Sequence, residues 1–169
     1  FHEAFTIAQN GRPGPVLVDI PKDVQFAKGT YIEKDKVNIP SHRLFSANKV
    51  QNPKNINEAV NLIAKAKKPI FYVGGGCINS GPIASKLVTE FIEMTGIPAT
   101  MTLMGLGVIP SSHKNSLGML GMHGMYEANM AMHECDVMIN IGARFDDRVT
   151  GRLDAFSPNS KKIHIDIDE

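Results

Sequence analysis

The sequence lacks the features that mark two large functional classes. Its formal net charge is only +1 over 169 residues, so bulk electrostatics favours neither nucleic acid nor an anionic membrane surface as a partner. It contains no apolar run close to the roughly 18–20 residues that a membrane-spanning helix needs. Hydrophobic residues make up 43% and charged residues 21%, which are ordinary proportions for a globular domain. We therefore predict a domain without nucleic-acid or membrane partners.

Cysteine and catalytic motifs are also scarce. Cys77 and Cys135 are the only cysteines, and their spacing fits neither a metal site nor a disulfide framework. We expect two buried free thiols in a reducing compartment, which predicts a cytoplasmic protein. His113, His123 and His133 do not share a helix face, so no metal site is predicted. There is no phosphate loop ending in Gly-Lys-Ser/Thr and no paired nucleophile and base.

The first part of the chain predicts the end of one domain followed by a connection. A helical pattern over residues 1–10 ends at Gly11, a rigid turn follows, and residues 16–20 form a short apolar run closed by Pro21. A helix and a strand are too small to bury a core, so we assign residues 1–25 to the tail of a preceding domain. Residues 26–47 lack periodicity and predict an extended linker.

A regular alternation of strand and helix patterns occupies residues 48–169. Strands are expected over residues 70–73, 97–102, 137–141 and 161–168, the last near a sheet edge because its isoleucines alternate with polar residues. Helices are expected from Asn55 as N-cap, from Pro82 to the stop at Gly96, and over residues 124–135. The fold class is α/β, a doubly wound and mostly parallel sheet with helices on both faces.

Each predicted helix carries an apolar stripe that we expect to face the core. The stripes are Ile56, Ala59, Val60 and Ile63; Ile83, Leu87, Phe91 and Met94; and Met125, Ala128, Met132 and Cys135. The chain begins inside a helical pattern and stops just after a strand pattern, so we expect a fragment of a longer polypeptide, with the 48–169 domain cut near its C-terminal end.

The most informative segment is residues 142–151, which follow the buried-looking strand at 137–141. Ligands of open α/β sheets bind at the carboxyl ends of strands, where this loop is expected to lie. Arg144, Arg148 and Asp146-Asp147 suit an anionic, hydroxyl-rich ligand such as a nucleotide cofactor. The aspartates also fit a metal pair or a solvated, salt-bridged turn. Asp166, near the end of the last strand, is either a ribose or adenine partner or a surface carboxylate.

Three glycine-containing segments add candidates. Gly74-Gly75-Gly76 lets backbone N–H groups approach a phosphate, but position 79 is Asn rather than the third fingerprint glycine, so a tight turn between strand and helix explains it equally well. Residues 102–107 and 120–124 bring methionines and His123 to a strand end and a helix start, which suits a pocket for an aromatic ring system. The alternative for these methionines is core packing: Met101, Met104, Met119, Met122 and Met125.

Taken together, these motifs resemble the thiamine-diphosphate-dependent acetolactate synthases (acetohydroxyacid synthases). The matching segments are Gly11-Arg-Pro-Gly-Pro-Val-Leu-Val-Asp-Ile-Pro-Lys-Asp23, Gly74–Gly76, Thr102–Gly107, Met119–Gly124 and Gly142–Gly151. The resemblance covers nearly the whole chain, and the last motif is the most specific. It implies a three-domain catalytic subunit whose central domain, here residues 48–169, holds FAD as a structural cofactor.

The resemblance also implies which residues contact FAD. Carried onto matching positions, they are Arg12, Gly74, Gly75, Gly76, Thr102, Leu103, Met104, Leu120, Gly121, Met122, His123, Gly124, Gly142, Arg144, Asp146, Arg148, Val149, Asp166 and Ile167. Lys22 matches a lysine that lines the substrate approach. Position 104 is Met where some members of the family carry Gln.

The implied reaction joins two pyruvates, or pyruvate and 2-oxobutyrate, with loss of CO2 in branched-chain amino-acid synthesis. The family's catalytic glutamate would precede Phe1 and its Mg²⁺ motif would follow Glu169. No catalytic residue and no thiamine diphosphate or Mg²⁺ site is therefore expected here, and the fragment should be inactive alone. The family forms homodimers or tetramers and often has a regulatory small subunit. Alternatives are another carboligase, such as glyoxylate carboligase, or a stand-alone nucleotide- or flavin-binding module.

Overall fold

The computed structural model of the protein describes residues 1–31 and 52–167, which belong to two compact units. The N-terminal unit contains helices α1 (His2–Gln9) and α2 (Lys22–Phe26), neither of which has a buried residue. The predicted first helix is confirmed, whereas α2 was not expected. Most of the predicted linker, residues 32–47, lies outside the described residues, and residues 27–31 have no regular structure.

The strand predicted at residues 16–20 is wrong for this chain. These residues have no strand conformation, and Leu17 is 92% exposed. A β-strand is stabilised only when a neighbouring strand accepts and donates its backbone hydrogen bonds. Within the described residues, no strand pairs with this segment. The apolar pattern alone was therefore insufficient.

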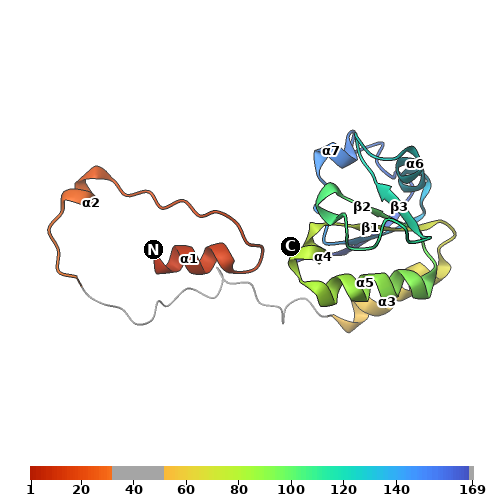
Figure 1. The fold of residues 1–169 in the computed structure, drawn as a ribbon, viewed down its shortest axis with the longest axis horizontal. Helices are drawn as coiled ribbons and strands as arrows, with labels where there is room; N and C mark the ends of the chain where they lie inside the picture. Colours follow the sequence, from red (N-terminus) through yellow and green to blue (C-terminus); the bar gives the residue numbers. More distant parts are fainter. Residues whose placement is uncertain (32–51, 168–169) are drawn as a thin grey trace. The chain divides into compact units, whose positions relative to one another are not determined.

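The second unit is a five-stranded parallel sheet in the order β3-β2-β1-β4-β5, and it confirms the predicted fold class (Figure 1). Its strands are β1 (Pro69–Val73), β2 (Ala99–Met101), β3 (Ser116–Met119), β4 (Val137–Ile141) and β5 (Lys161–Ile165). The interior position of β4 and the edge position of β5 are as predicted. Strand β3 was missed, because its four residues include Gly118, which strands normally avoid.

Helices cover both faces of the sheet and create two cores. On one face, α3 (Pro53–Lys65) and α5 (Pro82–Thr95) pack on Phe71 and Ile139. On the other, α6 (Tyr126–Glu134) and residues 143–156 pack on Tyr72 and Met138. Short helices α4 (Gly75–Asn79), η3 (Leu103–Gly105) and α7 (Asp147–Thr150) follow β1, β2 and β4. Cys77 and Cys135 are buried free thiols, as predicted.

The helix boundaries were predicted better than the helix faces. Gly96 ends α5 in the left-handed conformation, with φ of 67°, as expected. Of the predicted stripe, only Phe91 packs against the core, where Val88 and Ile92 are buried. The other three stripe residues are exposed: Ile83, Leu87 and Met94. Apolar residues occur on two sides of this helix, so periodicity could not tell which side the sheet covers.

The other two helices need smaller corrections. Helix α3 begins at Pro53, so Asn55 lies in its first turn and is not the N-cap. Its residues Ile56 and Val60 are exposed, while Ile63 packs against the core as predicted. Helix α6 begins at Tyr126, and its buried residues include Ala128 and Met132. The remaining predicted stripe residues of this helix divide: Cys135 is buried and Met125 is exposed.

Candidate functional site

The sheet brings most of the predicted ligand-binding residues to one edge. All five strands are parallel, so their carboxyl ends meet there. The predicted segments follow the strands one by one: Gly74–Gly76 after β1, Thr102–Met104 after β2, Leu120–Gly124 after β3, Gly142–Val149 after β4 and Asp166–Ile167 after β5. From β1 the chain continues to β2 and β3 on one side of the sheet, whereas β4 and β5 lie on the other side of β1. The junction between β1 and β4 is therefore the topological switch point.

The glycines at this switch point let two loops pack backbone against backbone. The N–H of Gly76 donates to the carbonyl oxygen of Gly142 at 3.0 Å. A Cβ atom on Gly74 would lie 2.1 Å from the same oxygen, and one on Gly75 would lie 2.9 Å from Cβ of Met104. The tight-turn alternative therefore accounts for these glycines. They shape the edge, whatever ligand it holds.

A buried asparagine sets the start of the 142–151 loop. Asn140 lies in β4 and is fully buried. Its Nδ2 donates to the carbonyl oxygen of Ala143 at 2.7 Å, and its Oδ1 accepts from the N–H of Ala143 at 3.1 Å. Because both backbone groups of one residue are held, the loop leaves the strand in one direction. The sequence did show a signal here, since a polar residue interrupts the apolar strand.

The charged residues of the 142–151 loop form the salt-bridged turn that was one predicted alternative. Asp146 caps α7: its Oδ1 accepts from the N–H of Arg148 at 3.0 Å, and its Oδ2 pairs with Arg144. The backbone N–H of Arg148 and then the guanidinium of Arg144 hold the pKa of Asp146 below its ordinary value. Arg148 lies 3.4 Å from the exposed carboxylate of Asp147. Both guanidinium groups remain largely exposed, so an anionic ligand could reach them.

The loop after β3 is attached to this turn. Asn129 in α6 holds Gly121 by two hydrogen bonds, with Gly121 N–H to Oδ1 at 2.8 Å and Nδ2 to the Gly121 carbonyl at 3.0 Å. The N–H of Met122 then donates to the carbonyl oxygen of Arg148 at 3.0 Å. Gly121 has φ of 101°, which favours glycine. Asn129, like Asn140, was missed, because its partners are visible only in the folded chain.

The methionines divide between the two predicted roles. Met101 is buried and belongs to the core. Met104 is 76% exposed and Met122 is 68% exposed, so core packing does not explain them. They lie in the segments that follow β2 and β3, and Leu103, which precedes Met104 in the sequence, is exposed as well. This exposed apolar surface at the carboxyl ends can pack against a flat aromatic ring.

The last strand adds a pair of side chains. Asp166 Oδ1 accepts from the N–H of Ile167 at 2.7 Å, and its Oδ2 lies 3.5 Å from Nε2 of His164. His164 was not predicted. His123 is exposed and lies three residues before α6 begins, so it does not occupy the helix start expected for it. Arg12 and Lys22 belong to the N-terminal unit, so the edge described here involves the other predicted residues.

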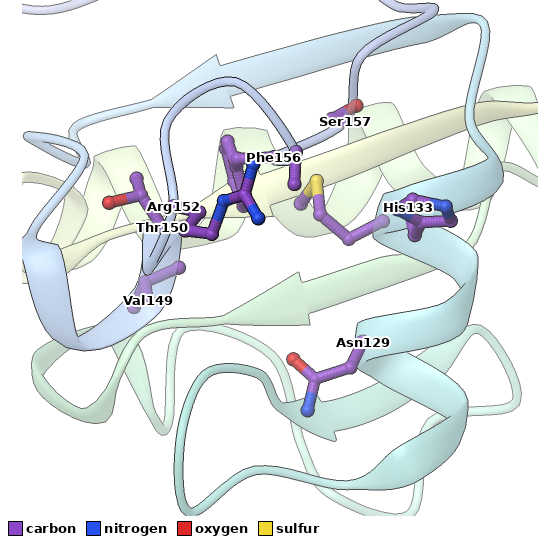
Figure 2. A pocket seen from close by; sticks show the side chains of 9 residues that line it. Asn129, His133, Val149, Thr150, Arg152, Phe156 and Ser157 are labelled. Atoms are coloured by element: carbon purple, nitrogen blue, oxygen red, sulfur yellow. The ribbon is translucent and has the colours of Figure 1, made fainter.

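Two cavities of the described residues lie largely outside this edge. One of about 170 Å³ lies between α6 and the segment after α7, and Val149 is its only predicted site residue (Figure 2). A second, open one of about 400 Å³ is lined by α3 and Lys161. The first is smaller than the roughly 300 Å³ at which ligand pockets begin. The second exceeds that size, but none of the residues that line it is a predicted site residue. We therefore take the surface formed by the loops at the carboxyl edge as the candidate site.

In residues 1–31 and 52–167, no three His, Cys, Asp or Glu side chains are grouped so as to hold a metal ion. Over the same residues, no helix is long and apolar enough to cross a membrane.

Comparison with known proteins assigns the chain to a family. Residues 56–169 match the model of the thiamine pyrophosphate enzyme central domain. The chain is 50% identical to the acetolactate synthase large subunit of Corynebacterium glutamicum and 48% identical to the acetolactate synthase of Mycobacterium bovis. It is 46% identical to the chloroplastic acetolactate synthase of Arabidopsis thaliana. Each match covers 98% of this chain but only 24–26% of the relative.

The chain thus spans about a quarter of the length of these relatives. The family match covers all five strands and most of α3, so the fold and the family assignment concern the same residues. The chain belongs to the thiamine pyrophosphate enzymes, and its residues 56–169 match their central domain.

Proposed function

We propose that this chain is the FAD-holding central domain of an acetolactate synthase catalytic subunit. Identities of 46–50% over nearly the whole chain support this assignment. The parent enzyme would condense two pyruvates, or pyruvate and 2-oxobutyrate, with release of CO2. The residues that perform this chemistry with thiamine diphosphate and Mg²⁺ would lie outside the present chain. The chain alone is therefore proposed to be inactive.

The proposed FAD site is the carboxyl edge of the sheet. Arg144 and Arg148 would neutralise the pyrophosphate, because guanidinium groups pair well with phosphate oxygens. Asp166 would accept hydrogen bonds from the ribose hydroxyls. The exposed side chains of Leu103, Met104 and Met122 would pack against the flavin. In this role FAD contributes binding energy and rigidity rather than electron transfer.

One observation carries the proposal: five separate segments predicted to contact FAD follow five parallel strands and so converge on a single edge. Two exposed arginines lie among them. The donor set fits a dinucleotide, since it combines cationic, carboxylate and apolar groups within one surface. In the full-length enzyme, Arg12 is proposed as a further FAD contact and Lys22 as a residue of the substrate approach.

The test is Arg148→Ala in the full-length enzyme. A charge-assisted contact to a phosphate contributes roughly 1.5–3 kcal/mol, so we expect a 10- to 100-fold increase in the Kd for FAD. The matched control is Arg152→Ala, which removes another exposed arginine that pairs with Asp154. Flavin fluorescence gives the Kd and thermal unfolding gives the stability. Unchanged FAD affinity in the Arg148 variant would contradict the assignment of Arg148 as a phosphate partner of FAD.

The remaining proposals concern the parent protein. We propose a cytoplasmic homodimer or tetramer that acts on small 2-oxoacids, with a regulatory small subunit as a possible partner. A screen of 2-oxoacids on the intact enzyme distinguishes it from another carboligase. Stoichiometric flavin retained by the purified chain would instead favour a stand-alone flavin module. We expect weak or absent retention, because neighbouring domains complete the proposed site.

A further inference from the structure

We propose that His164 is a positioning residue for the ligand at the carboxyl edge, acting through the carboxylate of Asp166. This inference rests on the proposed FAD site, because it assigns a role to a side chain that neither the sequence motifs nor the family resemblance singled out. His164 lies in the edge strand β5, two residues before Asp166. Side chains two residues apart lie on the same side of a strand.

The carboxylate of Asp166 has a partner at each of its two oxygens. Its two carboxylate oxygens have different neighbours: Oδ1 accepts from the N–H of Ile167 at 2.7 Å, and Oδ2 lies 3.5 Å from Nε2 of His164. The Asp166 side chain is only 14% exposed, whereas that of His164 is 41% exposed. Interactions at both oxygens restrict rotation of the carboxylate. A ligand hydroxyl would therefore meet an acceptor that is already oriented.

His164 also contacts the 142–151 loop. The His164 ring meets the ring of Phe145 edge to face, with centroids 5.2 Å apart. Phe145 has φ of 57°, an unusual value for a residue with a side chain, and its ring also contacts Tyr72 and Phe156. These aromatic contacts stabilise that backbone conformation. Since Phe145 lies between Arg144 and Asp146, His164 contacts the part of the loop that carries the proposed phosphate partner.

The strand that carries His164, β5, is an outermost strand of the described sheet. Within the described sheet, β5 pairs only with β4, and the N–H of Gly142 donates to the carbonyl oxygen of Ile165 at 2.8 Å. An outermost strand has fewer backbone hydrogen bonds to hold it than an interior strand, because only one neighbour pairs with it. Side-chain contacts therefore matter more for its geometry. His164 contacts both the loop after β4 and the carboxylate after β5, so one imidazole links two proposed ligand-binding segments.

The experiment separates the two contacts in the full-length enzyme. His164→Phe keeps a ring against Phe145 but removes the nitrogen beside Asp166, and His164→Gln keeps a polar hydrogen-bond donor without the ring. We expect His164→Phe to increase the Kd for FAD about 3- to 10-fold and His164→Gln to restore most of the affinity. Asp166→Asn should weaken binding as well. The double variant should bind no more weakly than Asp166→Asn alone, because His164 acts through Asp166.

His133→Phe is the matched control, because His133 is an exposed histidine on α6 and is not among the residues proposed to contact FAD. Thermal unfolding of each variant identifies any loss that is only structural. If His164→Phe fails to fold, His164→Leu, which also lacks the nitrogen beside Asp166, and its double variant with Asp166→Asn decide by the same comparison. Wild-type affinity in His164→Phe, with weakened binding in Asp166→Asn, would overturn the positioning role and leave the proposed FAD site intact. Unchanged affinity in both Asp166→Asn and Arg148→Ala would overturn the FAD site itself. A loss in His164→Phe that persists undiminished in the Asp166→Asn background would also overturn action through Asp166.

Discussion

The amino ends and the carboxyl ends of the parallel strands, which we call the amino edge and the carboxyl edge of the sheet, are held by different kinds of interaction. At the amino edge, the carboxylate of Asp136 accepts from the N–H groups of Lys67 at 2.6 Å and Lys68 at 2.9 Å. The Asp136 carbonyl accepts from the N–H of Lys161, which joins the starts of β1, β4 and β5. At the carboxyl edge, glycine backbones pack on each other, and arginines and methionines stay exposed.

This difference separates a stabilising edge from a binding edge. The carboxylate of Asp136 finds its partners within the domain, in the backbone before β1. The carboxyl edge is held by backbone contacts and by two asparagine side chains, which leaves its arginines available to a ligand. Substitutions at the amino edge should therefore alter unfolding alone, and those at the carboxyl edge should alter unfolding, ligand affinity or both.

The largest effect is expected from Gly74→Ala at the carboxyl edge. The new Cβ would lie 2.1 Å from the Gly142 carbonyl oxygen, and backbone cannot move aside as a flexible side chain can. We expect a loss of roughly 3 kcal/mol in the free energy of unfolding, measured by urea denaturation. Gly81→Ala is the control: φ there is 90° but no atom lies within 4 Å, so only conformational strain of roughly 1–2 kcal/mol applies. Equal losses in both variants would contradict the steric explanation.

A smaller effect is expected from Asn140→Leu. Removing the amide leaves the N–H and C=O of Ala143 without their partners in a buried place, which costs roughly 2 kcal/mol. Because the 142–151 loop would also shift, the Kd for FAD of the full-length enzyme should rise. Asn129→Leu is a useful comparison, since Asn129 is only half-buried and water can replace part of its bonding. Calorimetry would show whether the two variants lose different amounts of stability, and flavin titration would show whether they lose different amounts of FAD affinity. A neutral Asn140 variant would refute the importance of this amide.

The smallest effect is expected from Asp136→Asn, and only on stability. The N–H groups of Lys67 and Lys68 hold the pKa of Asp136 below its ordinary 3.8. A carboxylate whose pKa is lower in the folded than in the unfolded protein stabilises the fold fully at a pH above the unfolded pKa. This contribution is lost as the pH falls through the folded pKa. The stability difference between wild type and variant should thus be present at neutral pH and shrink below about pH 3.8. Unfolding followed from pH 6 to about pH 2 tests this, and altered FAD affinity would break the contrast between the edges.

Local features of the fold were accessible from the sequence. The stop of α5 at Gly96 was predicted, because a left-handed residue after a helix favours glycine whatever surrounds it. The interior strand β4 was predicted from its apolar run, and the edge strand β5 from its alternation. The salt-bridged turn around Asp146 was one predicted alternative, since charges only two residues apart meet in many loop conformations.

Features that depend on distant residues were missed. The side of α5 that faces the core is set by the sheet beneath it, and strand β3 forms against β2, where Thr100 Oγ1 donates to the Gly118 carbonyl at 3.0 Å. The contact of His164 with Phe145 is likewise between residues far apart in sequence. The hydrogen bonds of Asn129 and Asn140 depend on the path of the loops that carry their partners. Whether a polar residue is a surface residue or a clamp depends on the partner that folding supplies.

The sequence by itself determined the alternation of strands and helices, the glycine positions at the loops and the residue types proposed to meet a nucleotide cofactor. These follow from propensities and periodicities that act within a few residues. The tertiary structure alone decided the strand order, the buried side of each helix and the convergence of five loops on one edge. The physical reason is that burial and hydrogen-bond pairing are properties of chain segments far apart in sequence, brought together only by the packed sheet.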